Sequence, residues 1–157
     1  LSGEPDGGPG PQRGVIRSLL RADGRLADNL YADGGPSTTG TVGKVRMNGR
    51  EVFRHAVDKI SSSVLDIVRL ADLDCGAVDW FVPHQANIRI IEACARKLEI
   101  GMEKVIVTIE RHGNTSSASI PLALDEAIRD GRIKRGQLLA FASLGGGFAW
   151  GSALVRY

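Results

Sequence analysis

The sequence of 157 residues is poor in several features that would narrow its class. It has two cysteines, Cys75 and Cys94, which form no CxxC pair, so neither a disulfide framework nor a zinc site is indicated. No run approaches the roughly 20 apolar residues of a membrane-spanning helix. Neither sign of charge dominates, because 20 Lys and Arg face 18 Asp and Glu. A net charge of +2 does not support a non-specific nucleic-acid binder.

The composition that is present, 43% hydrophobic and 24% charged, is typical of a globular protein with one core. The chain opens at Leu1 without an initiator Met or a basic, hydrophobic leader, so we expect a cytoplasmic protein. Eight of residues 1–14 are Gly or Pro, which predicts a flexible segment there. A single domain is predicted over residues 15–157.

Apolar periodicity predicts the elements of that domain. Side chains repeating by threes and fours indicate an amphipathic helix over residues 50–71. A second helix is expected to bury the face formed by Ile88, Ile91, Ala95 and Leu98. A third is expected over 117–129, beginning late or kinking at Pro121. Short apolar runs predict strands over 15–20, 78–82, 105–109, 138–143 and 148–156, and a polar Gly/Ser/Thr-rich segment predicts a loop over 32–43.

Alternating strands and helices indicate an α/β fold, with helices packed on a central sheet. Such sheets bind ligands beyond the C-terminal ends of their strands. His84 follows one predicted strand and Asn114 follows the next, so we expect their side chains to converge. Taken alone, however, a histidine such as His84 is more often structural, and Asn114 is more often part of an ordinary turn or helix cap.

His84 and Asn114 together suit one kind of chemistry. Two N–H donors in a dry pocket stabilise the oxygen of an enolate, such as the one formed when a thioester substrate loses carbon dioxide, without metal or organic cofactor. The glycines 145–147 precede Phe148, and a backbone N–H there would serve a second oxyanion hole. Their alternative role is a tight turn between two strands.

Basic residues gather on two predicted helices. Arg89, Arg96 and Lys97 project away from the apolar face of the second helix, and Arg54 lies on the first. This pattern is that of a solvated helix face, or of a docking patch for an acidic carrier protein.

Other catalytic signatures receive little support. The glycines at 145, 147 and 151 miss the dinucleotide-binding fingerprint by one residue, and Gly43-Lys44 lacks the upstream glycine of a phosphate loop. There is no G-x-S-x-G elbow and no H-E-x-x-H pair. Neither Cys75 nor Cys94 has the setting of a nucleophile, and Cys94 is predicted to pack in the core.

Three strings carry a family resemblance: WFVPHQAN at residues 80–87, RHGNTS at 111–116 and GGGFAWGSA at 145–153. In this order they resemble the β-ketoacyl-acyl carrier protein synthase III family, and the match extends from about Val15 to Tyr157. The resemblance implies a thiolase-like α/β fold, of which this chain is the C-terminal half with a mixed sheet and packed helices. It also implies a decarboxylative condensation of acyl-CoA with malonyl-acyl carrier protein, which starts fatty-acid synthesis.

The resemblance assigns roles by position. His84 and Asn114 would bind the malonyl thioester oxygen, and Gly146 would bind the acyl-enzyme oxyanion. Phe53 and Asn87 would line the pantetheine tunnel. The carrier protein would contact the segment from Gln85 to Arg89, with support from Arg54, Arg96 and Lys97. The carrier-binding residues so implied are Gln85, Ala86, Asn87, Ile88, Arg89, Arg54, Arg96 and Lys97.

The same resemblance places the nucleophilic cysteine and the dimer-forming strand in an N-terminal half outside these 157 residues. The leading hypothesis is therefore an acyltransferase half that works with that missing half, as a homodimer when complete. Acyl carrier protein and acyl-CoA are the expected partners, with no cofactor beyond the coenzyme A thioester substrate, no metal, no nucleic acid and no membrane. The alternative is a non-catalytic carrier-protein or coenzyme A binding module; an unrelated nucleotide-binding domain is a third hypothesis.

Overall fold

The computed structural model describes residues 13–157, so most of the predicted flexible segment 1–14 lies outside the described residues. Its centre is a four-stranded sheet in the order β1-β6-β5-β4. Strand β6 is antiparallel to both of its neighbours, whereas β4 and β5 are parallel. The sheet is therefore mixed, as predicted. Its strands are β1 (Gly14–Ala22), β4 (Trp80–Pro83), β5 (Leu138–Gly145) and β6 (Ala149–Arg156).

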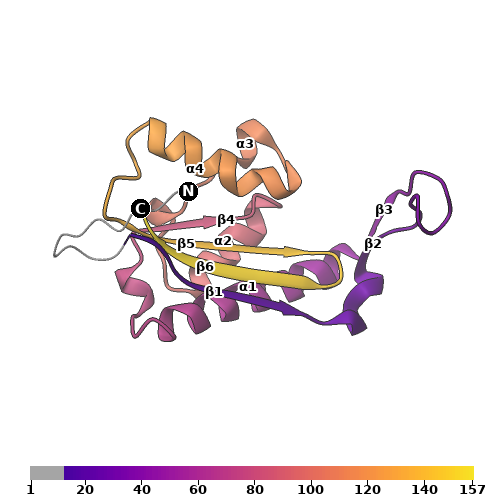
Figure 1. Cartoon of the computed structure of the whole chain (residues 1–157), viewed down its shortest axis with the longest axis horizontal. Helices are drawn as coiled ribbons and strands as arrows, with labels where there is room; N and C mark the ends of the chain where they lie inside the picture. The colour runs from indigo at the N-terminus through magenta and orange to yellow at the C-terminus, as the bar shows by residue number, and fades with distance from the viewer. Residues whose placement is uncertain (1–12) are drawn as a thin grey trace.

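Helices cover both faces of this sheet (Figure 1). Helix α1 (Gly49–Arg69) packs on one face, together with α2 (Ile88–Lys97), while α3 (Ile109–His112) and α4 (Ser119–Arg129) lie on the other. Asn48 and Asn87 cap α1 and α2 by accepting hydrogen bonds from backbone N–H groups of the first turn. Pro121 falls in the first turn of α4, where its missing N–H costs nothing, which explains the late start that the sequence predicts.

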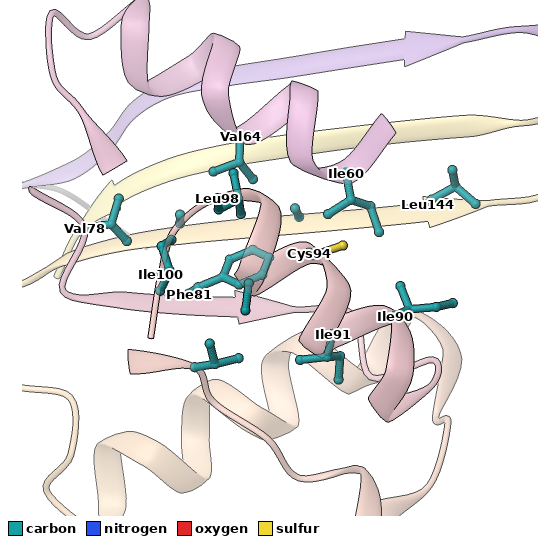
Figure 2. Packing of buried hydrophobic residues seen from close by; sticks show 14 of the residues in the cluster. Ile60, Val64, Val78, Phe81, Ile90, Ile91, Cys94, Leu98, Ile100 and Leu144 are labelled. Atoms are coloured by element: carbon teal, nitrogen blue, oxygen red, sulfur yellow. The ribbon is translucent and has the colours of Figure 1, made fainter. Parts of the chain in front are cut away.

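Neighbouring residues of β5 point into two separate cores. Leu138, Ala140 and Ala142 face α1 and α2, whereas Leu139 faces Ala123 and Ala127 of α4. This follows from the alternation of side chains along a strand. The larger core joins α1, α2 and the sheet around Phe81, with Ile60, Val64, Ile91 and Leu98 packed about it (Figure 2).

Two expectations about this region are wrong. Residues 105–109 form no strand: only a single bridge joins Val105 to Phe81, and the segment enters α3 at Ile109. The side-chain oxygen of Gln85 accepts a hydrogen bond from the Thr108 N–H at 2.9 Å, so the pairing of this segment with β4 ends there. Ile91, Ala95 and Leu98 of α2 are buried as expected, but Ile88 is 39% exposed, and Ile90 and Cys94 complete the buried face instead.

The segment between β1 and α1 contains structure that periodicity did not reveal. A 3-10 helix, η1 (Gly24–Asn29), leads into a two-stranded antiparallel sheet of β2 (Leu30–Ala32) and β3 (Val45–Met47). The predicted polar loop lies between these strands and projects from the body of the molecule (Figure 1). Strands of three residues are too short for a periodic signal. Three further 3-10 turns are η2 (Cys75–Ala77), η3 (Met102–Lys104) and η4 (Ser116–Ala118).

Candidate active site

His84 is fixed at the C-terminal end of β4 through both its backbone and its ring. Its N–H donates to the carbonyl of Ala142 on the parallel strand β5 at 2.9 Å. Its ring atom Nδ1 lies 2.5 Å from Oγ of Ser119, the first residue of α4. The other ring nitrogen, Nε2, is thereby left for a ligand. A strand end and a helix start thus hold one imidazole in place.

The environment of His84 favours a neutral ring. The residue is half-buried, and desolvation by this burial lowers the pKa of the imidazole below its usual value. A neutral imidazole carries one N–H and one bare nitrogen, so it donates a single hydrogen bond without adding charge. A neutral ring in this state can act as an oxyanion donor.

Gln85 corrects one sequence-based assignment. Its side chain is fully buried, and its amide donates to the carbonyls of Pro83 and Ile106 at 2.8 and 3.1 Å. Its carbonyl oxygen accepts from the Thr108 N–H. A side chain with every group used inside the protein does not contact a carrier protein, and additional protein around it would only bury it further. Gln85 clamps β4 to residues 106–108.

Asn114 lies in the exposed turn between α3 and α4. Gly113 before it has φ 65°, a left-handed conformation that glycine adopts without strain. The Asn114 side-chain oxygen accepts a hydrogen bond from the Ser116 N–H at 2.9 Å. This contact uses the oxygen and leaves the amide NH2 group as the outward donor. Ser119 contacts His84 only five residues later, so the turn that carries Asn114 ends beside the imidazole.

One carboxylate ties this turn to α4. Glu126 on α4 accepts from Arg111 and, at 3.1 Å, from His112 Nε2, both at the end of α3. Arg132 adds a third contact at 3.2 Å. The hydrogen bond from Arg111 is the main reason why the pKa of Glu126 lies below its ordinary value, with His112 and Arg132 adding to it. Glu126 therefore fixes the segment that precedes Asn114.

Gly146 lies in the turn between β5 and β6, as expected for a glycine run between two strands. A side chain at this position would meet the carbonyl oxygen of Leu30 at 2.8 Å, because the turn packs against the start of β2. Packing alone thus requires glycine at 146. Its assignment as an oxyanion donor remains a prediction.

An open hollow lies beside the start of α2. It has a volume of about 410 Å³ and is lined by Ala86, Asn87, Ile88, Ile109 and Glu110. Three residues that the resemblance placed in the carrier-binding segment therefore border one concave surface. Phe53, 39% exposed on α1, is not among these lining residues. Asn87 also caps α2, with its oxygen accepting from the Arg89 N–H at 2.9 Å.

The predicted basic residues divide into paired and unpaired cations. Arg54 binds Glu51 at 2.6 Å, and Lys97 binds Asp58 at 2.7 Å. Arg89 and Arg96 are exposed, and within residues 13–157 no carboxylate pairs with either. Seven residues separate them, so they lie on one stripe of α2. These two arginines are the cations of α2 that remain available to a partner.

Residues 13–157 hold no cluster of three or more His, Cys, Asp or Glu side chains arranged around a metal ion. Their helices include none with the length and apolar character to cross a membrane.

Cys94 is buried in the core, as predicted, and burial raises the pKa of its thiol to about 11, which suits packing rather than nucleophilic attack (Figure 2).

Ser119 and Glu126 are the site residues that sequence reasoning missed. A serine at the start of a predicted helix reads as a capping residue, and a glutamate on a helix surface reads as solvated. Both acquire their role from residues 35 and 14 positions away. Periodicity and local motifs carry no signal for such partners.

Comparison with known proteins gives a consistent result. Residues 68–157 match the model of the family described as 3-oxoacyl-[acyl-carrier-protein] synthase III C terminal. The chain is 55% identical over its whole length to the β-ketoacyl-[acyl-carrier-protein] synthase III of Bradyrhizobium sp., of which it covers 48%. The chain spans about half the length of the curated relatives it matches.

Solved structures resemble this chain closely. The 3-oxoacyl-[acyl-carrier-protein] synthase III of Aquifex aeolicus superposes with a TM-score of 0.86 at 42% identity, over 92% of this chain and 45% of that protein. The synthase III of Thermus thermophilus gives a TM-score of 0.87 at 39% identity, over 99% of this chain and 48% of the other. In both cases the similarity extends over roughly one half of a longer protein.

Proposed function

The chain belongs to the 3-oxoacyl-[acyl-carrier-protein] synthase III family as a C-terminal half with a thiolase-like α/β fold, and on that premise we propose that it supplies the enolate-stabilising donors of a condensing enzyme. The donors are His84 and Asn114. The reaction is the condensation of acyl-CoA with malonyl-acyl carrier protein. The cysteine that carries the acyl group comes from an N-terminal half.

In the proposed reaction the malonyl thioester first loses carbon dioxide. The electron pair of the broken carbon–carbon bond moves onto the thioester, whose oxygen becomes an enolate. N–H donors at His84 Nε2 and Asn114 Nδ2 stabilise that oxygen, because they are already oriented before the charge develops. The enolate carbon then attacks the acyl thioester on the cysteine, and the thiolate leaves. A backbone N–H at Gly146 would stabilise the intermediate oxyanion of this second step.

The observation that carries the proposal is how the two donor side chains are hydrogen-bonded. His84 has its Nδ1 engaged by Ser119 and a pKa lowered by burial, and Asn114 has its oxygen engaged by the Ser116 N–H. Each side chain is therefore anchored through one end and retains one N–H group for a ligand. The Asn114 contact is also that of an ordinary Asx turn, so the fixed, half-buried ring of His84 carries most of the argument.

The test is a decarboxylation assay. The chain is co-expressed with the N-terminal half of the Bradyrhizobium relative, and release of carbon dioxide from malonyl-acyl carrier protein is measured. We expect His84→Ala and Asn114→Ala each to lower the rate by about 100-fold to 1,000-fold, the usual loss for one oxyanion donor. Asn48→Ala, which also removes a helix-region asparagine, is the matched control and keeps the rate. An unchanged rate in either site variant would refute the proposal.

A second function is favoured by Arg89 and Arg96. Two exposed cations on one stripe of α2, with no carboxylate partner among the described residues, form a surface that an acidic carrier protein would bind without any chemistry. The adjoining hollow at Ala86, Asn87 and Ile88 would accept part of a coenzyme A or pantetheine chain. This module would function even where no cysteine is supplied.

Titration of the chain with acyl carrier protein at low and high salt tests this second function. Binding between opposite charges weakens as salt rises. Arg89→Glu should weaken binding by about tenfold or more. Arg129→Glu makes the same change of charge at an exposed position of α4, on the other face of the sheet, and should leave binding intact. Salt-insensitive binding, or equal effects of the two variants, would exclude the α2 surface.

A further inference from the structure

We propose that Ser119 is a positioning residue that sets the proton arrangement of His84: its hydroxyl donates to Nδ1 and thereby keeps the ring proton on Nε2. The inference rests on the proposed role of His84 and adds a residue to it. No motif in the sequence points to Ser119, and its hydroxyl meets the imidazole only because the first turn of α4 lies against the end of β4.

The contacts of the Ser119 oxygen decide the direction of this hydrogen bond. A hydroxyl has one proton to donate and two lone pairs to accept with. The Gln85 N–H donates to Ser119 Oγ at 3.2 Å, which occupies one lone pair. The remaining contact is His84 Nδ1 at 2.5 Å, and no other partner of this oxygen is found among residues 13–157.

Burial makes the two possible arrangements unequal. Ser119 is 2% exposed, so its proton cannot be satisfied by bulk water. If Nδ1 carried the ring proton and donated to Oγ, the hydroxyl proton would be left without an acceptor, which is costly in a buried site. If the hydroxyl donates to a bare Nδ1, the Gln85 N–H, the hydroxyl and the ring nitrogen are all satisfied. The second arrangement places the ring proton on Nε2.

Gln85 makes this arrangement rigid. Its buried side chain bonds the carbonyls of Pro83 and Ile106 and the Thr108 N–H, which fixes the backbone on either side of His84. The backbone N–H of Gln85 donates to Ser119 Oγ and so fixes the orientation of the hydroxyl group. His84 and Gln85, the two residues that directly follow β4, therefore bind one hydroxyl, so a shift of α4 would disturb the imidazole directly.

The tautomer can be read without any assay of activity. In the chain labelled with 15N-histidine, long-range 1H–15N correlation spectra distinguish a protonated from a bare ring nitrogen, and His84→Gln identifies the signals among the three histidines. We expect a bare Nδ1 and a protonated Nε2. Ser119→Ala should remove this preference and give a mixture, while Ser117→Ala, the same change at an exposed neighbour, should keep it. A protonated Nδ1 in the unaltered chain would overturn the proposal, even if Ser119→Ala failed to fold.

Activity separates this inference from the proposed function. In the complex with an N-terminal half, Ser119→Ala should lower the decarboxylation rate about tenfold at an unchanged KM for the malonyl substrate. If His84→Ala has no effect, the proposed function fails, whatever the tautomer. If His84→Ala abolishes the reaction but Ser119→Ala changes neither rate nor tautomer, the inference about Ser119 fails and the proposed function stands.

Discussion

The hydroxyl oxygens of Ser63 on α1 and Ser152 on β6 lie 2.6 Å apart, although 89 residues separate them in the sequence. Ser152 also donates to the backbone carbonyl of Ser63 at 2.9 Å. Both side chains are buried, and because Ser152 uses its proton on the Ser63 carbonyl, the Ser63 hydroxyl donates to Ser152 Oγ. This pair fixes the position of the longest helix over the strand that follows the Gly146 turn.

We expect the Ser63–Ser152 pair to be strongly coupled in stability. Ser152→Ala alone should lower the free energy of unfolding by about 1–2 kcal/mol, because it leaves the buried Ser63 hydroxyl without its acceptor. Ser63→Ala should cost less, because Ser152 still donates to the backbone carbonyl of residue 63. The double variant should cost less than the sum, since it removes both polar groups together. Urea unfolding of the four proteins measures the coupling. Additive losses would show that the hydroxyls act independently.

Gln85→Leu should destabilise the chain by about 3 kcal/mol or more. Leucine keeps much of the volume but leaves the Thr108 N–H and two carbonyls unpaired in a buried site. Arg89→Ala, at an exposed position, should stay within about 0.5 kcal/mol of the parent. Chemical denaturation checks both. A stable Gln85→Leu protein with weakened carrier binding would instead return Gln85 to the carrier-binding surface.

The Glu126 contacts should make a pH-dependent contribution to stability. The pKa of Glu126 is lowered below 4.5 in the folded chain, chiefly by Arg111, so the unfolded chain takes up this proton first as the pH falls. The contribution is therefore present above about pH 4.5 and is lost below it. The difference in unfolding free energy between the parent and Glu126→Gln should be larger at about pH 6 than at about pH 3.5. A difference independent of pH would contradict the assignment.

The two cysteines should differ in reactivity. Burial raises the pKa of both thiols, but Cys94 is enclosed between α1 and α2 whereas Cys75 is half-buried in η2. Iodoacetamide should therefore modify Cys75 well before Cys94 in the folded chain, and both at similar rates in urea. Mass spectrometry of proteolytic peptides gives the order. Faster labelling of Cys94 would indicate that the α1–α2 contact opens.

Cys94 should also reduce stability at high pH. Its pKa rises from 9.0 to about 11 on folding, so the unfolded chain ionises first as the pH increases. Stability that is present below pH 9 is then lost as the pH rises toward 11. Cys94→Ala removes this ionisation, so its unfolding free energy should fall less steeply than that of the parent over the same range. Parallel curves would contradict the shift.

Local sequence patterns predicted most elements of this fold. Helix α1 and strands β5 and β6 have the periodicity of their secondary structure, and Pro121 marked the late start of α4. The strand expected at residues 105–109 failed for a tertiary reason, because the Gln85 side chain takes the Thr108 N–H that a neighbouring strand would have used. Ile88 was expected in the core and is exposed, whereas Ile91, Ala95 and Leu98 of the same predicted face are buried together with Ile90 and Cys94.

The order and identity of the motif residues, the helices, the longer strands and the mixed α/β class follow from the sequence itself, because spacing and residue type act over a few neighbouring positions. The folded chain alone decides that Ser119 meets the ring of His84, that Gln85 is buried and that Lys97 is neutralised by Asp58 while Arg89 is not. These relationships join residues that are distant along the chain. They depend on how helices dock on the sheet, and docking is set by the combined packing of both cores rather than by any local pattern.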